Sequence, residues 1–322
     1  MKWLVPIGAA AVALLAVPGA DLYYQSSWGQ GCARCHEIGI DYNLWHQSAH
    51  RNINCVECHA SSLSTDVRRV AAHVKGEVPE QVHLGTEDVF AMVARCEKCH
   101  REEFAQWRAG PHSVTYAKIF ADGEHNRKEP PIDDCMRCHG MHFEGGIREL
   151  VALAPNAPLA NRPAIPCLAC HSIHRTGDLL AKGARELLRP SVGLFDRRSR
   201  INLTAASLPM PGILEGTRAV KISPDQRQAL CYQCHAPLST MQVGGGDDRT
   251  PVGVHEGLSC RACHQKHGEA SRQSCAECHP RLSNCGLDVE KMDTTFANAK
   301  SRHNVHWVKC VDCHVNGVPK KK

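Results

Sequence analysis

The five-residue pattern Cys-x-x-Cys-His occurs nine times in this chain, and no other feature limits its fold so strongly. Of the 19 cysteines, 18 lie in the nine copies, and Cys285 stands alone outside them. Two thiols at this spacing can each form a thioether to one porphyrin, and the histidine that follows is then placed beneath the iron. The pattern therefore predicts nine covalent c-type haems. The predicted thioether cysteines are Cys32, Cys35, Cys55, Cys58, Cys96, Cys99, Cys135, Cys138, Cys167, Cys170, Cys231, Cys234, Cys260, Cys263, Cys275, Cys278, Cys310 and Cys313.

Zinc sites and disulfides are the competing interpretations of so many cysteines. Tetrahedral zinc also uses Cys-x-x-Cys pairs, but it does not need a histidine directly after every second cysteine. A thioredoxin-like redox pair would occur once, beside a βαβ pattern, and a disulfide framework would not place nine histidines in register. Both interpretations are weak. For Cys285 we expect a buried, inert thiol, with an exposed reactive thiol as the alternative.

Histidine supplies the predicted axial ligands. The first ligands are the nine motif histidines His36, His59, His100, His139, His171, His235, His264, His279 and His314. Histidine makes up about 6.5% of the chain, and this excess favours ligation by many of the twelve others. Those expected to bind iron, several of them in repeated patterns beside motifs, are His50, His73, His112, His125, His142, His174, His255, His267, His303 and His306. His46 and His83 are expected to be ordinary histidines.

The repeated pattern His-x-x-His follows three motifs and makes a specific prediction. A residue three positions after a motif histidine is about one helical turn away, so it stays on the same side of that porphyrin. It cannot reach round to the opposite face. His174 and His267 should therefore each bind a haem other than the one whose motif they follow.

Composition predicts a fold built around the cofactors. Aromatic residues are only 5% of 322 residues, too few for an ordinary core of this length, so the macrocycles must supply the apolar interior. We expect a mainly α multihaem cytochrome c fold with extensive irregular loops and almost no sheet. Each haem adds about −1 when oxidised, so the formal charge of +5 becomes about −4. Many Lys and Arg residues are then propionate partners, and nothing indicates nucleic-acid binding.

The longest interval between motifs, from Cys167 to Cys231, divides five haems from four. We expect a signal or anchor over 1–20, a five-haem module over 21–175, a haem-free connecting segment over 176–222 and a four-haem module over 223–322. Helices are predicted from Thr86 into Cys96 and over 179–188. A third should run into Cys231 from the capping-box sequence over 223–226.

The first 20 residues carry one charge, Lys2, and an apolar run over 3–19. They are either a cleaved secretory signal or an uncleaved membrane anchor. As a helix the run spans roughly 25 Å, just enough to cross a bilayer, and Pro18 makes cleavage after Ala20 unfavourable. We favour the anchor, on the periplasmic or another extracytoplasmic side, where c-type haem is attached; the alternative is a secreted protein.

Two resemblances extend this interpretation. The segment over 32–38, the apolar run before it and Ser48-Ala49-His50 ahead of Cys55 resemble membrane-anchored NapC/NrfH-type quinol dehydrogenases, over about residues 1–60. That family often has Met where this chain has Ile38. From Cys96 to Cys313, the Trp-x4-His and Cys-x-x-Cys-His-x-x-His patterns are similar to the wider multihaem superfamily, which includes octahaem hydroxylamine oxidoreductases and tetrathionate reductases.

The predicted function is electron transfer along closely packed, mostly bis-His haems in anaerobic respiration. Enough histidines exist to fill every iron, and no motif replaces its histidine by lysine. We therefore expect an electron carrier rather than an enzyme. The alternative is a multihaem oxidoreductase in which one open haem acts on a small nitrogen or sulfur compound. Expected partners are other cytochromes, or a quinol-oxidising or terminal reductase complex.

Overall fold

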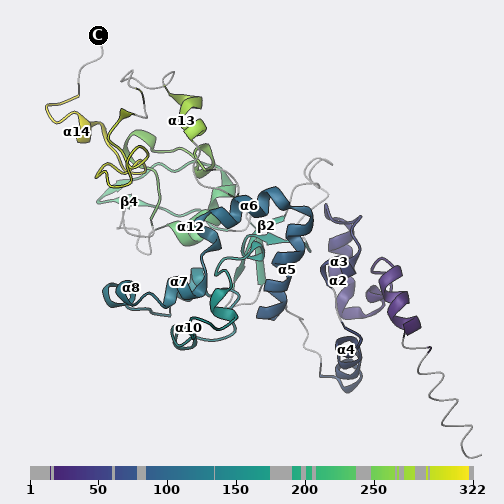
Figure 1. Ribbon diagram of the computed structural model, residues 1–322. Coiled ribbons are helices and arrows are strands. Elements are labelled where there is room, and N and C mark those ends of the chain that lie inside the picture. The colour runs from purple at the N-terminus through teal and green to yellow at the C-terminus, as the bar shows by residue number, and fades with distance from the viewer. Residues whose placement is uncertain are drawn as a thin grey trace, which may run out of the picture. The chain divides into compact units, whose positions relative to one another are not determined.

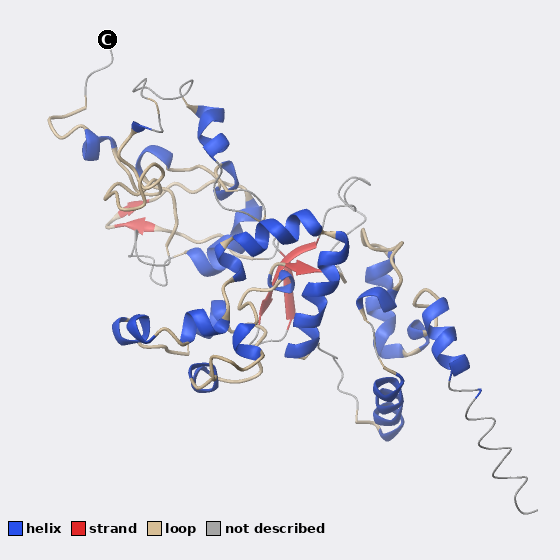
Figure 2. Cartoon of the chain, viewed as in Figure 1, coloured by secondary structure: helices blue, strands red, loops and turns tan. Residues whose placement is uncertain are grey.

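The computed structural model describes residues 15, 18–59, 62–77, 85–133, 135–174, 191–196, 201–204, 208–236, 248–264, 267, 272–279, 288 and 291–318. These residues form short helices joined by long loops, with few strands (Figures 1 and 2). The expected mainly α fold with extensive irregular loops is confirmed. His83, Cys285 and the predicted helix over 179–188 lie outside the described residues.

The chain divides into two compact units. Unit 1 comprises residues 1–101, 142–144 and 166–202, and unit 2 comprises 102–141, 145–165 and 203–322. These units are defined by contacts within the polypeptide, whereas the modules expected over 21–175 and 223–322 are defined by haem number. The modules therefore remain a prediction.

Unit 1 is built around one longer helix. Its helices are η1 (Cys32–Arg34), α2 (His36–His46), α3 (Cys55–Cys58), α4 (Leu63–Lys75), α5 (Thr86–Cys99) and η4 (Cys167–Ala169). The helix predicted from Thr86 is confirmed as α5, which has Glu87 and Asp88 in its first turn, where carboxylates stabilise the helix dipole. One face of α5 buries Val89, Phe90, Met92 and Val93, and the helix packs against α3 and η4.

A small antiparallel sheet completes unit 1. It has the order β1 (His171–Ser172), β2 (Ser191–Asp196) and β3 (Ile201–Thr204), with His171 opposite Val192. Because β1 starts at a motif histidine, the strand fixes the backbone there directly after the fifth motif.

Unit 2 consists of short helices and one hairpin. The helices are α6 (Arg101–Ala109, its first residue in unit 1), η2 (Pro111–Ser113), α7 (Tyr116–Phe120), α8 (Gly123–Lys128), α9 (Cys135–His139), α10 (Ile147–Val151), η3 (Leu159–Asn161), η5 (Gln226–Gln228), α12 (Ala229–His235), η6 (Gly253–His255), η7 (Cys260–Ala262), α13 (Arg272–Cys278) and α14 (Cys310–Cys313). The hairpin pairs β4 (Leu214–Glu215) with β5 (Arg218–Ala219). A core of Ile213, Val220, Tyr232, Ala236 and Val252 joins this hairpin to α12.

The helical turn before Cys231 begins later than the capping-box sequence predicts. It starts with η5 at Gln226, and its N-cap is Asp225, whose carboxylate accepts a hydrogen bond from the backbone N–H of Arg227. Ser223 instead accepts a hydrogen bond from the N–H of Asp225 at 3.3 Å. Both residue types are good caps, and the additional ion pair between Asp225 and the Arg227 guanidinium at 2.7 Å favours the later start.

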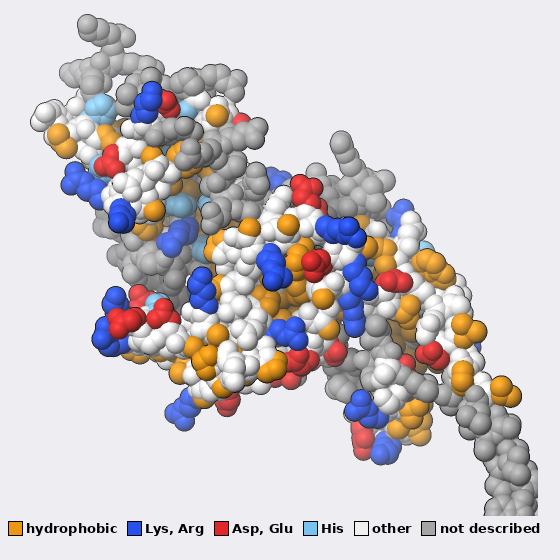
Figure 3. All heavy atoms as spheres, in the orientation of Figure 1, with side chains coloured by type: hydrophobic (Ala, Val, Ile, Leu, Met, Phe, Trp, Pro, Cys, Tyr) orange, Lys and Arg blue, Asp and Glu red, His pale blue; other side chains and the backbone are white. Residues whose placement is uncertain are grey.

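Two observations concern the outer surface. Among the described residues, no helix is both long enough and apolar enough to cross a membrane. Basic and acidic side chains are interspersed among the residues coloured on the face that Figure 3 draws.

Candidate haem sites

The first cysteine of every motif lies in a helix or a 3-10 turn. These first cysteines are found in η1, α3, α5, α9, η4, α12, η7, α13 and α14. A helical turn places residues i and i+3 on the same face, so both thiols of a motif point to one side. None of the 18 motif cysteines forms a disulfide in the part of the chain that the structure describes. This is the arrangement that two thioethers to one porphyrin require.

Histidines from outside the motifs lie against motif histidines. Five contacts between histidine rings are described, and each joins one motif histidine to one other histidine. The pairs are His59 with His174 at 5.8 Å between ring centres, His264 with His306 at 6.0 Å, His100 with His50 at 6.1 Å, His235 with His112 at 6.1 Å, and His279 with His255 at 6.4 Å. The first and third pairs lie in unit 1, and the others lie in unit 2.

The spacing of these rings fits an iron between them. Two imidazoles that bind one iron from opposite faces, each through a bond of about 2 Å, hold their ring centres roughly 6 Å apart. Direct ring packing can give similar distances, so the spacing alone does not identify the site. The composition of the pairs favours an iron site, because each pair contains one motif histidine, which would lie beneath a porphyrin, and one histidine from elsewhere that would bind the opposite face.

The hydrogen bonds of the second histidine also fit ligation. The His174 Nδ1 lies 3.0 Å from the Asp41 carboxylate, the His255 Nδ1 2.9 Å from the Val305 carbonyl oxygen, and the His306 Nδ1 3.0 Å from the Asn304 side-chain oxygen. Metal-binding histidines usually donate one ring N–H to such an acceptor, which orients the other nitrogen toward the metal. In these three residues Nε2 is therefore the nitrogen available to iron.

Ligation also needs a neutral imidazole, and burial favours that form. Burial, with a smaller contribution from nearby His264, lowers the pKa of His306 to about 4. Burial likewise lowers the pKa of His142 to about 4, although a hydrogen bond to the backbone of Leu168 opposes this effect. Leu168 lies inside the motif that begins at Cys167, so His142 is held against a haem site.

The remaining predicted ligands have varied surroundings. The His303 Nδ1 lies 2.8 Å from the Asp293 carbonyl oxygen, in the same arrangement as His255. His73 and His125 lie on exposed parts of α4 and α8, and His267 is partly buried. For these four histidines and for His142 no contact with a motif histidine ring is described, and iron ligation by every predicted histidine remains a prediction.

Motif cysteines from different haem sites also meet. The side chains of Cys96 and Cys167 are hydrogen-bonded in unit 1, and those of Cys231 and Cys260 are hydrogen-bonded in unit 2. The bond from Cys260 lowers the pKa of Cys231 to about 7, although burial opposes this shift. Two predicted thioether positions are therefore adjacent in each pair, and porphyrins attached there would be neighbours.

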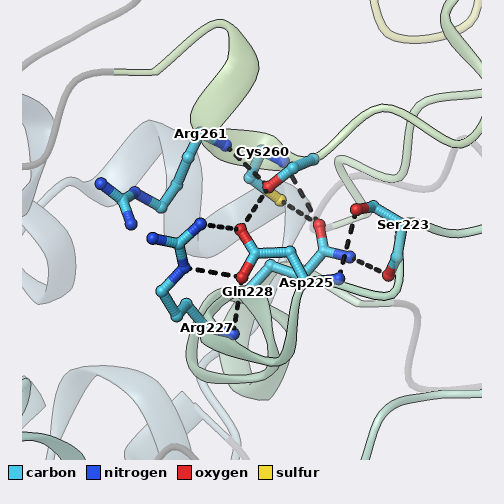
Figure 4. Close-up of polar contacts among 7 residues, drawn as sticks. Ser223, Asp225, Arg227, Gln228, Cys260 and Arg261 are labelled. Atoms are coloured by element: carbon cyan, nitrogen blue, oxygen red, sulfur yellow. Dashed lines mark hydrogen bonds and ion pairs between the residues drawn. The ribbon is translucent and has the colours of Figure 1, made fainter. Parts of the chain in front are cut away.

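A buried amide holds the second of these cysteine pairs. Gln228 is fully buried and donates from Nε2 to the Ser223 carbonyl oxygen at 2.6 Å, while its Oε1 accepts from the Cys260 N–H at 3.2 Å (Figure 4). Beside it, Ser259 donates to Asp225 at 3.1 Å. These bonds join η5 to η7 and so hold two motifs together.

Asp41, Asn304 and Gln228 belong to the site but are not identified by the sequence motifs. Asn304 stands two residues before His306, a spacing that allows a side-chain bond, and this local pattern is a usable signal. Asp41 and Gln228 act on residues far away in the sequence, and their neighbourhood contains no comparable signal.

The thioether cysteines and the paired histidines together define a multihaem c-type cytochrome. Within that class, residues 95–172 and 204–265 match the model of the family described as cytochrome c554 and c-prime. The matched segments contain the motifs that begin at Cys96, Cys135, Cys167, Cys231 and Cys260. No curated protein and no solved structure gives a significant match. This match supports a multihaem c-type cytochrome with covalent haem that acts in electron transfer.

Proposed function

We propose that this chain is a nine-haem electron conduit in which two histidines fill the axial positions of every iron. One observation carries the proposal: in each of the five ring pairs, a motif histidine faces a histidine from elsewhere in the chain. When bound, c-type haem supplies a one-electron Fe(III)/Fe(II) couple at each motif. The paired imidazoles would bind the iron from both faces and would leave no position there for a substrate.

The same pairs support a chain of neighbouring sites. His50 lies just before the motif of Cys55 but faces His100, and His174 follows the motif of Cys167 but faces His59. Each of these distal histidines is thereby tied to two motifs at once. This supports the predicted crossed ligation by His174, and it fixes the spacing between haem sites, which electron hopping requires.

The cysteine contacts provide the short steps within this chain. The side chains of Cys96 and Cys167, and those of Cys231 and Cys260, are close neighbours, so porphyrins attached to them would bring two edges together in each unit. Burial raises the pKa of the Cys263 thiol, and nearby Cys275 raises it as well. The motif that begins at Cys275 would therefore provide a third site beside the pair formed by Cys231 and Cys260. These contacts between motif cysteines support a set of neighbouring haem sites, and we propose that electrons pass from haem to haem between them.

The proposal also includes a location. Residues 1–20 would direct the chain across the cytoplasmic membrane and remain as an anchor, with the haem sites in the periplasm serving anaerobic respiration. Exposed apolar side chains close to this segment support the anchor: Leu15 is 77% exposed, Leu22 67% and Trp28 51%. A redox partner such as another cytochrome, or a quinol-oxidising or terminal reductase complex, would exchange electrons with the conduit. Recovery of the protein in the soluble fraction, with an N-terminus near Asp21, would refute the anchor.

Replacement of a distal histidine tests the conduit. His306→Ala in the full-length holoprotein should turn one iron high-spin and able to bind CO when reduced, while the intact mass still shows every haem. His306→Gly with added imidazole should restore the low-spin state. His46→Ala is the matched control, because His46 is exposed and its described ring contacts are with Tyr42 and Trp45. If His306→Ala stays fully low-spin and binds no CO, the ligand assignment is wrong.

A further inference from the structure

The carboxylate of Asp41 lies behind one of the paired histidines. Asp41 is on α2, and its Oδ1 is 3.0 Å from the His174 Nδ1. On its other side, the His174 ring faces His59 at 5.8 Å between ring centres. The three residues come from distant parts of unit 1 and form the series carboxylate, distal imidazole, proximal imidazole.

Two other histidines of the five ring pairs, His255 and His306, have a described Nδ1 bond, and both acceptors are neutral. The His255 Nδ1 bonds a backbone carbonyl and the His306 Nδ1 bonds an amide oxygen. Among the five paired distal histidines, His174 is the one for which the described residues place a carboxylate at Nδ1. The Asp41 side chain is about half exposed, and an aspartate in contact with water carries a full negative charge near neutral pH.

We infer that Asp41 is a positioning residue that lowers the reduction potential of the haem site at Cys55. A charged acceptor pulls the Nδ1 proton and gives the imidazole some imidazolate character, which makes Nε2 a stronger donor. The added negative charge stabilises Fe(III), which carries one more positive charge than Fe(II). The one-electron reduction of this site is therefore less favourable than at sites where the acceptor is neutral. This inference rests on the proposed ligation by His174.

The consequence is a ranking of three sites by the charge behind their distal ligand. The site of His59 and His174 has the lowest potential, and the sites of His255 and His306 lie above it. An electron that enters the conduit leaves the low-potential site most readily. Asp41 thus gives one haem site of the conduit a lower reduction potential, although its two ligands are histidines as at the other sites.

Spectroelectrochemical titration of the full-length holoprotein tests the inference with two reciprocal variants. Asp41→Asn keeps an oxygen acceptor for Nδ1 but removes the charge, so one haem should shift to higher potential while the others stay unchanged. Asn304→Asp places a charge behind His306, so a different haem should shift to lower potential. Both variants should remain low-spin by EPR, because the ligands are intact.

His174→Ala distinguishes failure of this inference from failure of the proposed function. A high-spin iron in His174→Ala, together with unchanged potentials in Asp41→Asn, would overturn the role of Asp41 alone. If His174→Ala keeps every iron low-spin and binds no CO, the ligation itself is wrong and the inference fails with it. A positive shift of one potential in Asp41→Asn, with a high-spin iron in His174→Ala, supports both.

Discussion

Replacement of Gln228 by leucine should loosen the contact between two haem motifs. Leucine has a similar volume but removes the hydrogen bonds of the buried amide to the Ser223 carbonyl and to the N–H and sulfur of Cys260. The bond to the Ser223 carbonyl is buried, and the bond from the Cys260 N–H is partly buried. The unpaired Ser223 carbonyl therefore costs more free energy than the unpaired Cys260 N–H. A buried backbone group left without a partner costs about 1–3 kcal/mol. The added apolar burial of leucine offsets part of this, which leaves a loss of about 2–3 kcal/mol in the stability of the η5–η7 contact.

Hydrogen exchange followed by mass spectrometry measures this loss locally. A stability change of about 2–3 kcal/mol corresponds to exchange between ~30-fold and ~150-fold faster. The increase should appear in peptides that cover 223–235 and 258–264, whereas peptides from α5 in unit 1 should keep their rates.

Gln106→Leu is the control for this experiment, because the Gln106 amide makes one long bond of 3.4 Å to Glu102. Its effect should stay below about 0.5 kcal/mol. Unchanged exchange over 258–264, or an equal increase in α5, would refute the role given to Gln228.

Three further predictions concern backbone strain, haem number and ligand orientation. Gly253 has a φ of +72° and a Cβ there would collide with a backbone carbonyl, so Gly253→Ala should cost at least ~2 kcal/mol by calorimetry. At Gly212 nothing lies within 4 Å, and Gly212→Ala should change stability little. Intact mass should give nine haems per chain, and eight or fewer would contradict the motif count. The ring planes lie at 89° in the pair that contains His255 and at 19° in the pair that contains His306. Replacing His255 should therefore remove a strongly axial low-spin EPR signal and replacing His306 a rhombic one, and loss of the same signal from both would contradict these orientations.

Local chemistry made the proximal half of the site predictable. The two cysteines and the histidine of a motif lie within five consecutive residues, so they stay close together whatever the tertiary structure. The five histidines that the structure pairs with motifs were also expected as ligands, because they stand in or near repeated patterns. Their partners were not predictable, since His112 and His235 are 123 residues apart in the sequence.

Tertiary contacts decided the rest. The mainly α, loop-rich fold followed from low aromatic content and the number of motifs, and α5 followed from its periodic apolar face. The start of the turn before Cys231 did not follow, because Ser223 and Asp225 are both good caps. The ion pair with Arg227 and the bond from Ser259 favour Asp225, and the second of these comes from a residue 34 positions away. The contact of His174 with the Asp41 carboxylate could not be predicted for the same reason, because the two residues are far apart in the sequence.

Spin quantitation of the oxidised wild-type protein by low-temperature EPR, with CO titration of the reduced protein, tests the central claim most directly. If two histidines fill every iron, low-spin ferric signals should account for nine irons per chain and no CO should bind. A high-spin signal equivalent to one iron or more, with matching CO uptake, would contradict the closed conduit and indicate an open haem at which a substrate could react.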